Sequence, residues 1–180
     1  MRVNSTLLLL NALFISLAVL SCGNGGSDSK KEEPKNLSRE ELMELNQSRS
    51  RVEERRIKKY IERRGRDYQS SGTGLRYSIY EHGDSAAPKA EEGQIAVMEF
   101  TVRLLNGDTA YSSRPGKPGE FLIGMDHVES GLHEGITYLR PGDKAELIMP
   151  PHLAHGLVGD LNEIPMNATI IYDIHLLEVK

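Results

Sequence analysis

Histidine and cysteine are the residues of this sequence whose side chains could bind a metal ion or attack a substrate. Four of the six histidines lie between residues 127 and 155: His127, His133, His152 and His155. Structural zinc sites combine histidines with cysteines or carboxylates at short spacing, and no cysteine or acidic pair completes such a set here. The sequence therefore predicts no metal site, and no GxGxxG segment indicates a nucleotide site.

The only cysteine, Cys22, follows an apolar segment, residues 7–20, which comes after the basic Met1-Arg2. That segment is shorter than the roughly 20 residues of a membrane span, and it fits a secretory signal. The residues Val19-Leu20-Ser21-Cys22 are similar to a bacterial lipobox, which implies cleavage before Cys22 and diacylglyceryl attachment to its thiol. The alternative is an ordinary signal peptide with a chance cysteine. Attached acyl chains would hold the protein on a membrane.

The composition divides the chain into four segments. Residues 1–21 are the predicted signal peptide, and residues 22–37, rich in small and charged side chains, are a flexible tether. Residues 38–74 form a charged helical arm with its linker, and residues 75–180 form the remaining domain. The formal net charge of −4 argues against a nucleic-acid partner. Aromatic residues make up 6% of the chain, without tryptophan, so the core must be mostly aliphatic.

The helical arm carries both a start and a stop signal. Ser38 with Glu41 is a capping box, and Gly65 follows Arg64 as a C-terminal cap. Between them, apolar residues recur every three to five positions: Leu42, Leu45, Val52, Ile57, Tyr60 and Ile61. This stripe is consistent with a helix that pairs with a second copy or docks a partner. It is equally consistent with a solvated spacer that packs lightly on its own domain.

The segments after the arm alternate between strands and turns, with one helix among them. Residues 75–80 and 95–105 alternate as strands, and the second puts Ala96, Met98, Phe100 and Val102 on one face. The Asn106-Gly107 pair predicts a hairpin turn. The segment from Tyr68 to Gly74 is expected to be a loop. Further strands are expected at 121–124, 140–150 and 168–179, with a short helix over 128–139 and a long loop over 152–167. A lone amphipathic helix must bury its apolar stripe on a sheet, so we expect an α+β fold, an antiparallel sheet curled around one short helix.

The sequence from Gly93 to Lys180 resembles an FKBP-type peptidyl-prolyl isomerase domain. The resemblance lies in the order and spacing of several short motifs: Asn106-Gly107, Ser112-Ser113, Phe121-Leu122-Ile123-Gly124, Val128, Gly131 with Gly135, Pro141-Gly142-Asp143-Lys144, Leu153-Ala154-His155-Gly156, Ile164-Pro165, and the last strand. It implies a ligand pocket between the sheet and the helix. Together with the lipobox and the arm, it makes the chain similar to gliding-motility-associated isomerase lipoproteins of Bacteroidetes.

The resemblance implies an enzyme that rotates prolyl peptide bonds of polypeptide clients without a cofactor. Rotation of a peptide bond faces a barrier of about 18–20 kcal/mol, and unaided prolyl isomerisation takes tens to hundreds of seconds. Because resonance makes the planar amide the more polar state, a dry apolar pocket favours the twisted transition state. A backbone N–H directed at the substrate carbonyl can hold that twist.

Carried onto this sequence, the resemblance implies a catalytic pocket of seven residues: Phe100, Val128, Glu129, Leu132, His155, Ile164 and Tyr172. Tyr111 and Phe121 would form the substrate-binding rim. Glu129 would act through its backbone N–H, so the type of its side chain would matter little.

The sequence departs from the family pattern in four places. Leu132 stands where the family has a tryptophan floor, and His155 stands where it has a tyrosine. Ala110-Tyr111 replaces Phe-Asp, and Gly119 replaces an aromatic residue. Each lost ring removes on the order of 1–3 kcal/mol of apolar contact, so we expect a shallower, wetter pocket and reduced activity.

Two functions fit these observations. The first is a lipid-anchored prolyl isomerase on the outer membrane, facing the periplasm, that assists the folding of exported envelope proteins. The second is a catalytically weak chaperone or scaffold for secretion or gliding machinery. The helical arm could pair two copies in either case.

Overall fold

The computed structural model describes residues 37–180, so the predicted signal peptide, most of the tether and Cys22 lie outside the described residues. The chain divides into two compact units, Met1–Ser38 and Arg39–Lys180, and everything below concerns the second. Among the described residues, no helix has both the length and the apolar composition needed to cross a bilayer.

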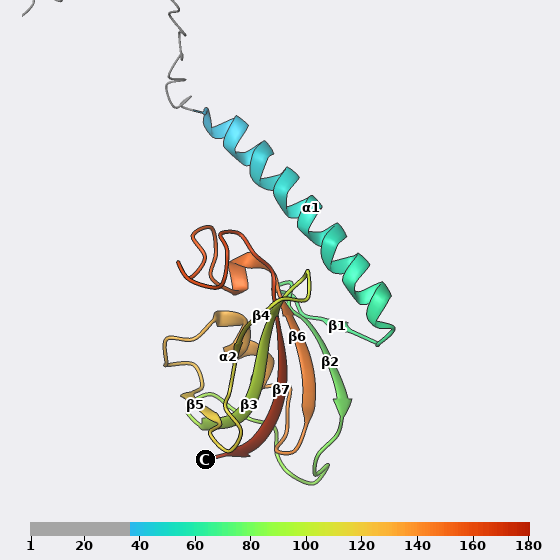
Figure 1. The fold of residues 1–180 in the computed structure, drawn as a ribbon, viewed down its shortest axis with the longest axis vertical. Coiled ribbons are helices and arrows are strands. Elements are labelled where there is room, and N and C mark those ends of the chain that lie inside the picture. Colours follow the sequence, from blue (N-terminus) through green and yellow to red (C-terminus); the bar gives the residue numbers. More distant parts are fainter. Residues whose placement is uncertain (1–36) are drawn as a thin grey trace, which may run out of the picture. The chain divides into compact units, whose positions relative to one another are not determined.

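The second unit is built on one antiparallel sheet of seven strands (Figure 1). Six strands follow the order β1-β2-β6-β7-β3-β4, and β5 also pairs with β3. The strands are β1 (Gln69–Ser70), β2 (Arg76–Glu81), β3 (Ile95–Leu104), β4 (Thr109–Ser112), β5 (Gly119–Leu122), β6 (Lys144–Met149) and β7 (Ile170–Val179). The helices are α1 (Arg39–Arg64), α2 (Ser130–Ile136) and the 3-10 turn η1 (Pro151–Leu153). The predicted α+β fold, an antiparallel sheet with a short helix, is confirmed, and α1 precedes it.

The inner face of the sheet carries the main core. Strand β3 sends Ala96, Met98 and Val102 into that core, as the alternation predicts. In β7, Ile170, Tyr172, Ile174 and Leu176 do the same, while Ile171 lies in a second cluster on the outer face. The predicted hairpin closes at Gly107, whose N–H donates to the carbonyl of Leu104 at 2.9 Å.

Two glycines of helix α2 lie directly against side chains of β6. A Cβ on Gly131 would lie 2.9 Å from Cγ of Met149, and a Cβ on Gly135 would lie 2.4 Å from Cδ1 of Leu147. Because residues four apart lie on the same face of a helix, the two glycines form one flat side. This close approach fixes the depth at which α2 lies on the sheet.

The structure corrects the ends of two predicted elements. The helix predicted over 128–139 is regular only from Ser130 to Ile136, because the bonds after it reach back three residues, as in Leu139 N–H to Ile136. The loop predicted over 68–74 contains β1, whose Gln69 lies opposite Tyr77 of β2. Two residues at a sheet edge are too short to produce a readable alternation.

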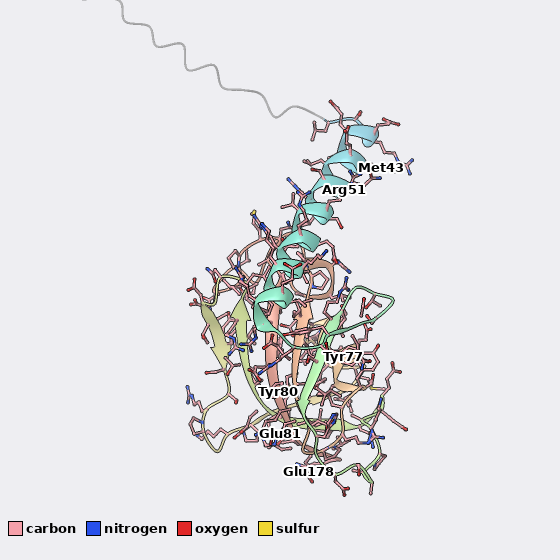
Figure 2. The ribbon with its side chains drawn as sticks, turned by 90° about the vertical axis from the view of Figure 1, so that its right-hand side faces the viewer. Met43, Arg51, Tyr77, Tyr80, Glu81 and Glu178 are labelled. Atoms are coloured by element: carbon pink, nitrogen blue, oxygen red, sulfur yellow. The ribbon has the colours of Figure 1, made fainter. Side chains whose placement is uncertain are left out.

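Helix α1 ends at Arg64, and Gly65 follows in the left-handed region with φ of +63°, as predicted. Its second half packs on the outer face of the sheet, where Ile57 contacts a cluster with Ile148 and Ile171. Its first half extends beyond the sheet, and Met43 and Arg51 are labelled in that part of the helix in Figure 2. The side chains of Leu42, Met43 and Leu45 are exposed there.

A buried carboxylate ties α1 to the sheet. The side chain of Glu146 in β6 is 0% exposed, and it accepts hydrogen bonds from Tyr60 at 2.9 Å, from Arg66 at 3.3 Å, and from Arg64 and Tyr68. A buried charge is tolerated only when paired in this way. Burial, the Glu146 charge and their hydrogen bond raise the pKa of Tyr60 to about 12. The arm is therefore anchored by a specific polar cluster rather than packed lightly.

We predict that Gly135→Ala destabilises the fold by about 1–3 kcal/mol, because the new methyl group would overlap Leu147 in a fully buried part of the core. Urea unfolding at neutral pH measures the change. Gly72→Ala is the matched control, since a Cβ there meets no atom within 4 Å. Equal unfolding midpoints for the two variants would contradict a close-packed α2.

Candidate active site

The residues predicted to form the pocket meet where α2, β3, β7 and the loop before β7 come together. Leu132, Ile164 and Tyr172 belong to the main core cluster, and Phe100, Val128 and Tyr111 pack against it. The rings of Phe100 and Tyr172 lie 5.9 Å apart at 40°. With Glu129 and its bonded partner His155, eight of the nine predicted pocket and rim residues therefore lie in or against this part of the core.

The side chain of Glu129 has a role that the sequence interpretation did not give it. It is 9% exposed, and its carboxylate accepts hydrogen bonds from the Tyr172 hydroxyl at 3.1 Å and from Nε2 of His155 at 2.9 Å. A tyrosine hydroxyl that is buried needs an acceptor, and Glu129 supplies it. Burial, followed by the Glu129 charge and this hydrogen bond, raises the pKa of Tyr172. The interior of the site is therefore polar as well as apolar.

The backbone N–H of Glu129 is available as a hydrogen-bond donor among the described residues. The residue precedes α2 as its N-cap in an extended conformation, with φ of −61° and ψ of 139°. Its carbonyl accepts from the N–H groups of Leu132 and His133. Its own N–H has no acceptor within residues 37–180, as is usual for the first N–H groups of a helix. A carbonyl oxygen brought to this point would find a donor.

The ring of Phe100 lies in the space beside Gly119. A Cβ on Gly119 would lie 2.9 Å from Cε1 of Phe100, so the Phe100 ring occupies the space that a side chain at position 119 would take. The glycine that appears as a lost wall in the sequence is the reason that Phe100 can lie where it does.

A carboxylate also reaches the site from an unpredicted position. The Tyr111 hydroxyl donates to Asp160, which lies in the loop between His155 and Ile164. Asp160 also accepts from the backbone N–H groups of Asn162 at 2.9 Å and of Ile164 at 2.8 Å. Burial works in the opposite direction, but these three hydrogen bonds lower the pKa of Asp160. The only sequence signal was an aspartate four residues before Ile164, which is common in loops.

Phe121 corrects a further prediction. It is 4% exposed and contacts His133 edge-on, with ring centroids 5.5 Å apart, so it is a core residue and not part of a substrate-binding rim. Its strand, β5, pairs with β3 and turns the Phe121 side chain inward. The other predicted rim residue, Tyr111, is half-buried beside Asp160.

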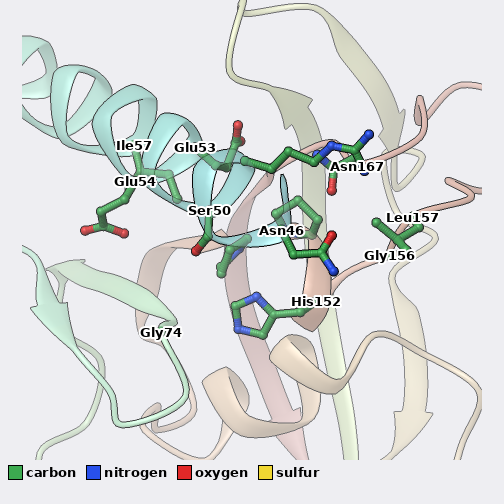
Figure 3. A pocket seen from close by; sticks show the side chains of 13 residues that line it. Asn46, Ser50, Glu53, Glu54, Ile57, Gly74, His152, Gly156, Leu157 and Asn167 are labelled. Atoms are coloured by element: carbon green, nitrogen blue, oxygen red, sulfur yellow. The ribbon is translucent and has the colours of Figure 1, made fainter. Parts of the chain in front are cut away.

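The larger hollows of the described structure lie elsewhere. A cavity of about 380 Å³ lies between α1 and the segment that follows β6 (Figure 3). Ser50, Glu53, His152 and Leu157 are among its lining residues, and none of the predicted site residues is. Neither this cavity nor two others, of about 330 and 370 Å³, is lined by Val128, Ile164 or Tyr172. One of the predicted site residues, Phe100, lines the hollow of about 330 Å³.

Sequence comparison identifies the family. A profile of the FKBP-type peptidyl-prolyl cis-trans isomerases matches residues 87–177. The chain belongs to this family. FkpA of Escherichia coli strain K12, an FKBP-type peptidyl-prolyl cis-trans isomerase, is 36% identical over 115 residues, which cover 62% of this chain and 40% of FkpA. FK506-binding protein 2 of Dictyostelium discoideum is 34% identical over 107 residues, covering 59% of this chain and 80% of that protein.

The fold comparison agrees with the family assignment. The crystal structure of AtFKBP13 superposes with a TM-score of 0.58 and 28% identity, covering 63% of this chain and 99% of the other. The shared part is therefore a whole FKBP domain. The alignment with FkpA spans 40% of that relative's length, so FkpA as a whole is not a guide to this chain.

Proposed function

We propose that this chain is a peptidyl-prolyl cis-trans isomerase that acts on proline-containing polypeptides. The observation that carries the proposal is the backbone N–H of Glu129, which has no acceptor within residues 37–180, beside the apolar side chains of Val128, Leu132 and Ile164. Two features speed the rotation of a prolyl amide: a donor for its carbonyl, and apolar surroundings for its ring. Membership in the isomerase family supports the same reaction.

In this reaction no bond to the protein forms. The proline ring rests against Val128, Ile164 and the ring of Tyr172, while the Glu129 N–H donates to a substrate carbonyl. Loss of amide resonance in the twisted state makes the bond less polar, so apolar contacts stabilise that state more than the planar one. The N–H holds the carbonyl at the angle at which the bond has rotated.

Reduced activity is part of the proposal. Leu132 offers less contact area than a tryptophan, and the Glu129 carboxylate adds charge to a site that works best when dry. Both effects weaken the preference for the twisted amide. The Phe100 ring offsets part of the lost apolar contact, because it fills the space beside Gly119.

We predict that Val128→Ala lowers kcat/KM for a short prolyl peptide about fivefold to tenfold, because it removes apolar contact worth roughly 1 kcal/mol. A protease-free isomerisation assay on the purified full chain measures this. Val52→Ala, in α1, is the control and should leave the rate unchanged. A wild-type rate equal to that of buffer alone would refute the isomerase proposal.

A second function, a binding module with little catalysis, is favoured by one observation. The loop between η1 and β7 exposes four apolar side chains: Leu157, Val158, Leu161 and Met166. Exposed apolar groups next to a shallow site suit the capture of unfolded chains. A test of cellular function with Val128→Ala separates the two functions, since a chaperone or scaffold would retain its cellular role despite the lowered turnover.

We also propose that the protein is the lipid-anchored form of this family, acting on exported proteins at the cell envelope, with the gliding-motility lipoproteins as its nearest type. Support comes from the lipobox-like Val19-Leu20-Ser21-Cys22. In bacterial cells, Cys22→Ala should lose incorporation of labelled palmitate and leave the membrane fraction. Equal membrane association of the wild type and the variant would contradict the anchor.

Pairing of two copies through the first half of α1 remains a proposal, supported by its exposed Leu42, Met43 and Leu45. Sedimentation equilibrium of the purified chain should give twice the monomer mass, and Leu42→Glu with Leu45→Glu should give the monomer. A monomeric wild type at tens of micromolar would contradict it.

A further inference from the structure

The candidate site has one carboxylate inside it and a second at its edge. Glu129 lies inside, bonded to the Tyr172 hydroxyl and to His155. Asp160 lies in the loop that leads to Ile164, bonded to the Tyr111 hydroxyl and to the Ile164 N–H. Both therefore touch residues that the resemblance to FKBP domains assigns to the pocket and its rim.

Neither carboxylate forms an ion pair with a lysine or an arginine of the described residues. Within residues 37–180, no lysine or arginine nitrogen lies within 4.0 Å of Glu129 or Asp160, and Glu129 pairs with His155 alone. The contrast with Glu146 on the outer face is direct, because Arg64 and Arg66 both pair with that carboxylate. Glu146, which ties α1 to the sheet, thus has arginine partners that Glu129 and Asp160 lack within residues 37–180.

The position of Glu129 links the charge to the reaction. Its N–H is the proposed donor for the substrate carbonyl, so its carboxylate lies within one residue's length of the prolyl bond. A lysine or arginine side chain on the neighbouring substrate residue carries its charge on a flexible stem that can reach this far. The hydrogen bonds that lower the pKa of Asp160 keep a second negative charge at the edge of the site.

We infer that Glu129 and Asp160 make this site selective for prolyl bonds preceded by lysine or arginine. The inference rests on the proposed isomerase function. A basic side chain gains an ion pair with a partly buried carboxylate, and an acidic one meets repulsion. The Glu129 side chain is then a determinant of specificity, in addition to the role of its backbone N–H.

The test compares three peptides that differ only in the residue before proline: lysine, leucine or glutamate. For the wild-type full chain, kcat/KM should be about fivefold higher with lysine than with leucine and lowest with glutamate, and the preference should shrink in high salt. Glu129→Gln keeps a side-chain acceptor for Tyr172 but removes the charge, so it should lower the lysine-to-leucine ratio to near one. Asp160→Asn should lower it in part.

Glu178→Gln is the matched control, because it makes the same change of net charge on exposed β7 and should keep the lysine preference. Calorimetric binding of the three peptides gives a second readout that does not need turnover. Absence of turnover with every peptide refutes the isomerase proposal, and binding then decides the selectivity by itself. A lysine preference that is absent, or that Glu129→Gln leaves unchanged, overturns the inference even where turnover is normal.

Discussion

The site depends on how closely α2 approaches the sheet. Gly131 and Gly135 present a flat side to β6, and a single added methyl group on either would meet Met149 or Leu147. This contact sets the depth of the helix, and so it sets where the residues at its N-terminal end lie. Glu129 is held as the N-cap of that helix, and among the described residues its N–H has no acceptor. A packing constraint within the core therefore positions the one backbone donor that prolyl isomerisation needs.

The polarity of the site follows from a second constraint, the need to satisfy a buried hydroxyl. Tyr172 lies on the inner face of β7, and its hydroxyl must find an acceptor among its neighbours. Glu129 provides that acceptor, and His155 holds the carboxylate from the other side. The three residues form one polar unit inside an otherwise apolar cluster. This arrangement gives the site a negative charge.

Much of the fold follows from local patterns in the sequence. Alternation in β3 predicts which residues face the core, and the Asn106-Gly107 hairpin and the end of α1 at Arg64 are read correctly. The contacts that depend on residues far apart could not be read in this way. Glu146 looks like a solvated charge until α1 covers it, and Asp160 gives no sign of its bond to Tyr111.

The central claim is that a prolyl segment binds at the N-terminal end of α2. Nuclear magnetic resonance of the ¹⁵N-labelled full chain, titrated with a short lysine-proline peptide, tests it most directly. The account predicts that the largest amide shifts fall on Val128 and Glu129, with exchange cross-peaks between the cis and trans forms of the peptide. Shifts centred instead on Ser50, His152 and Leu157, which line the cavity beside α1, would contradict it.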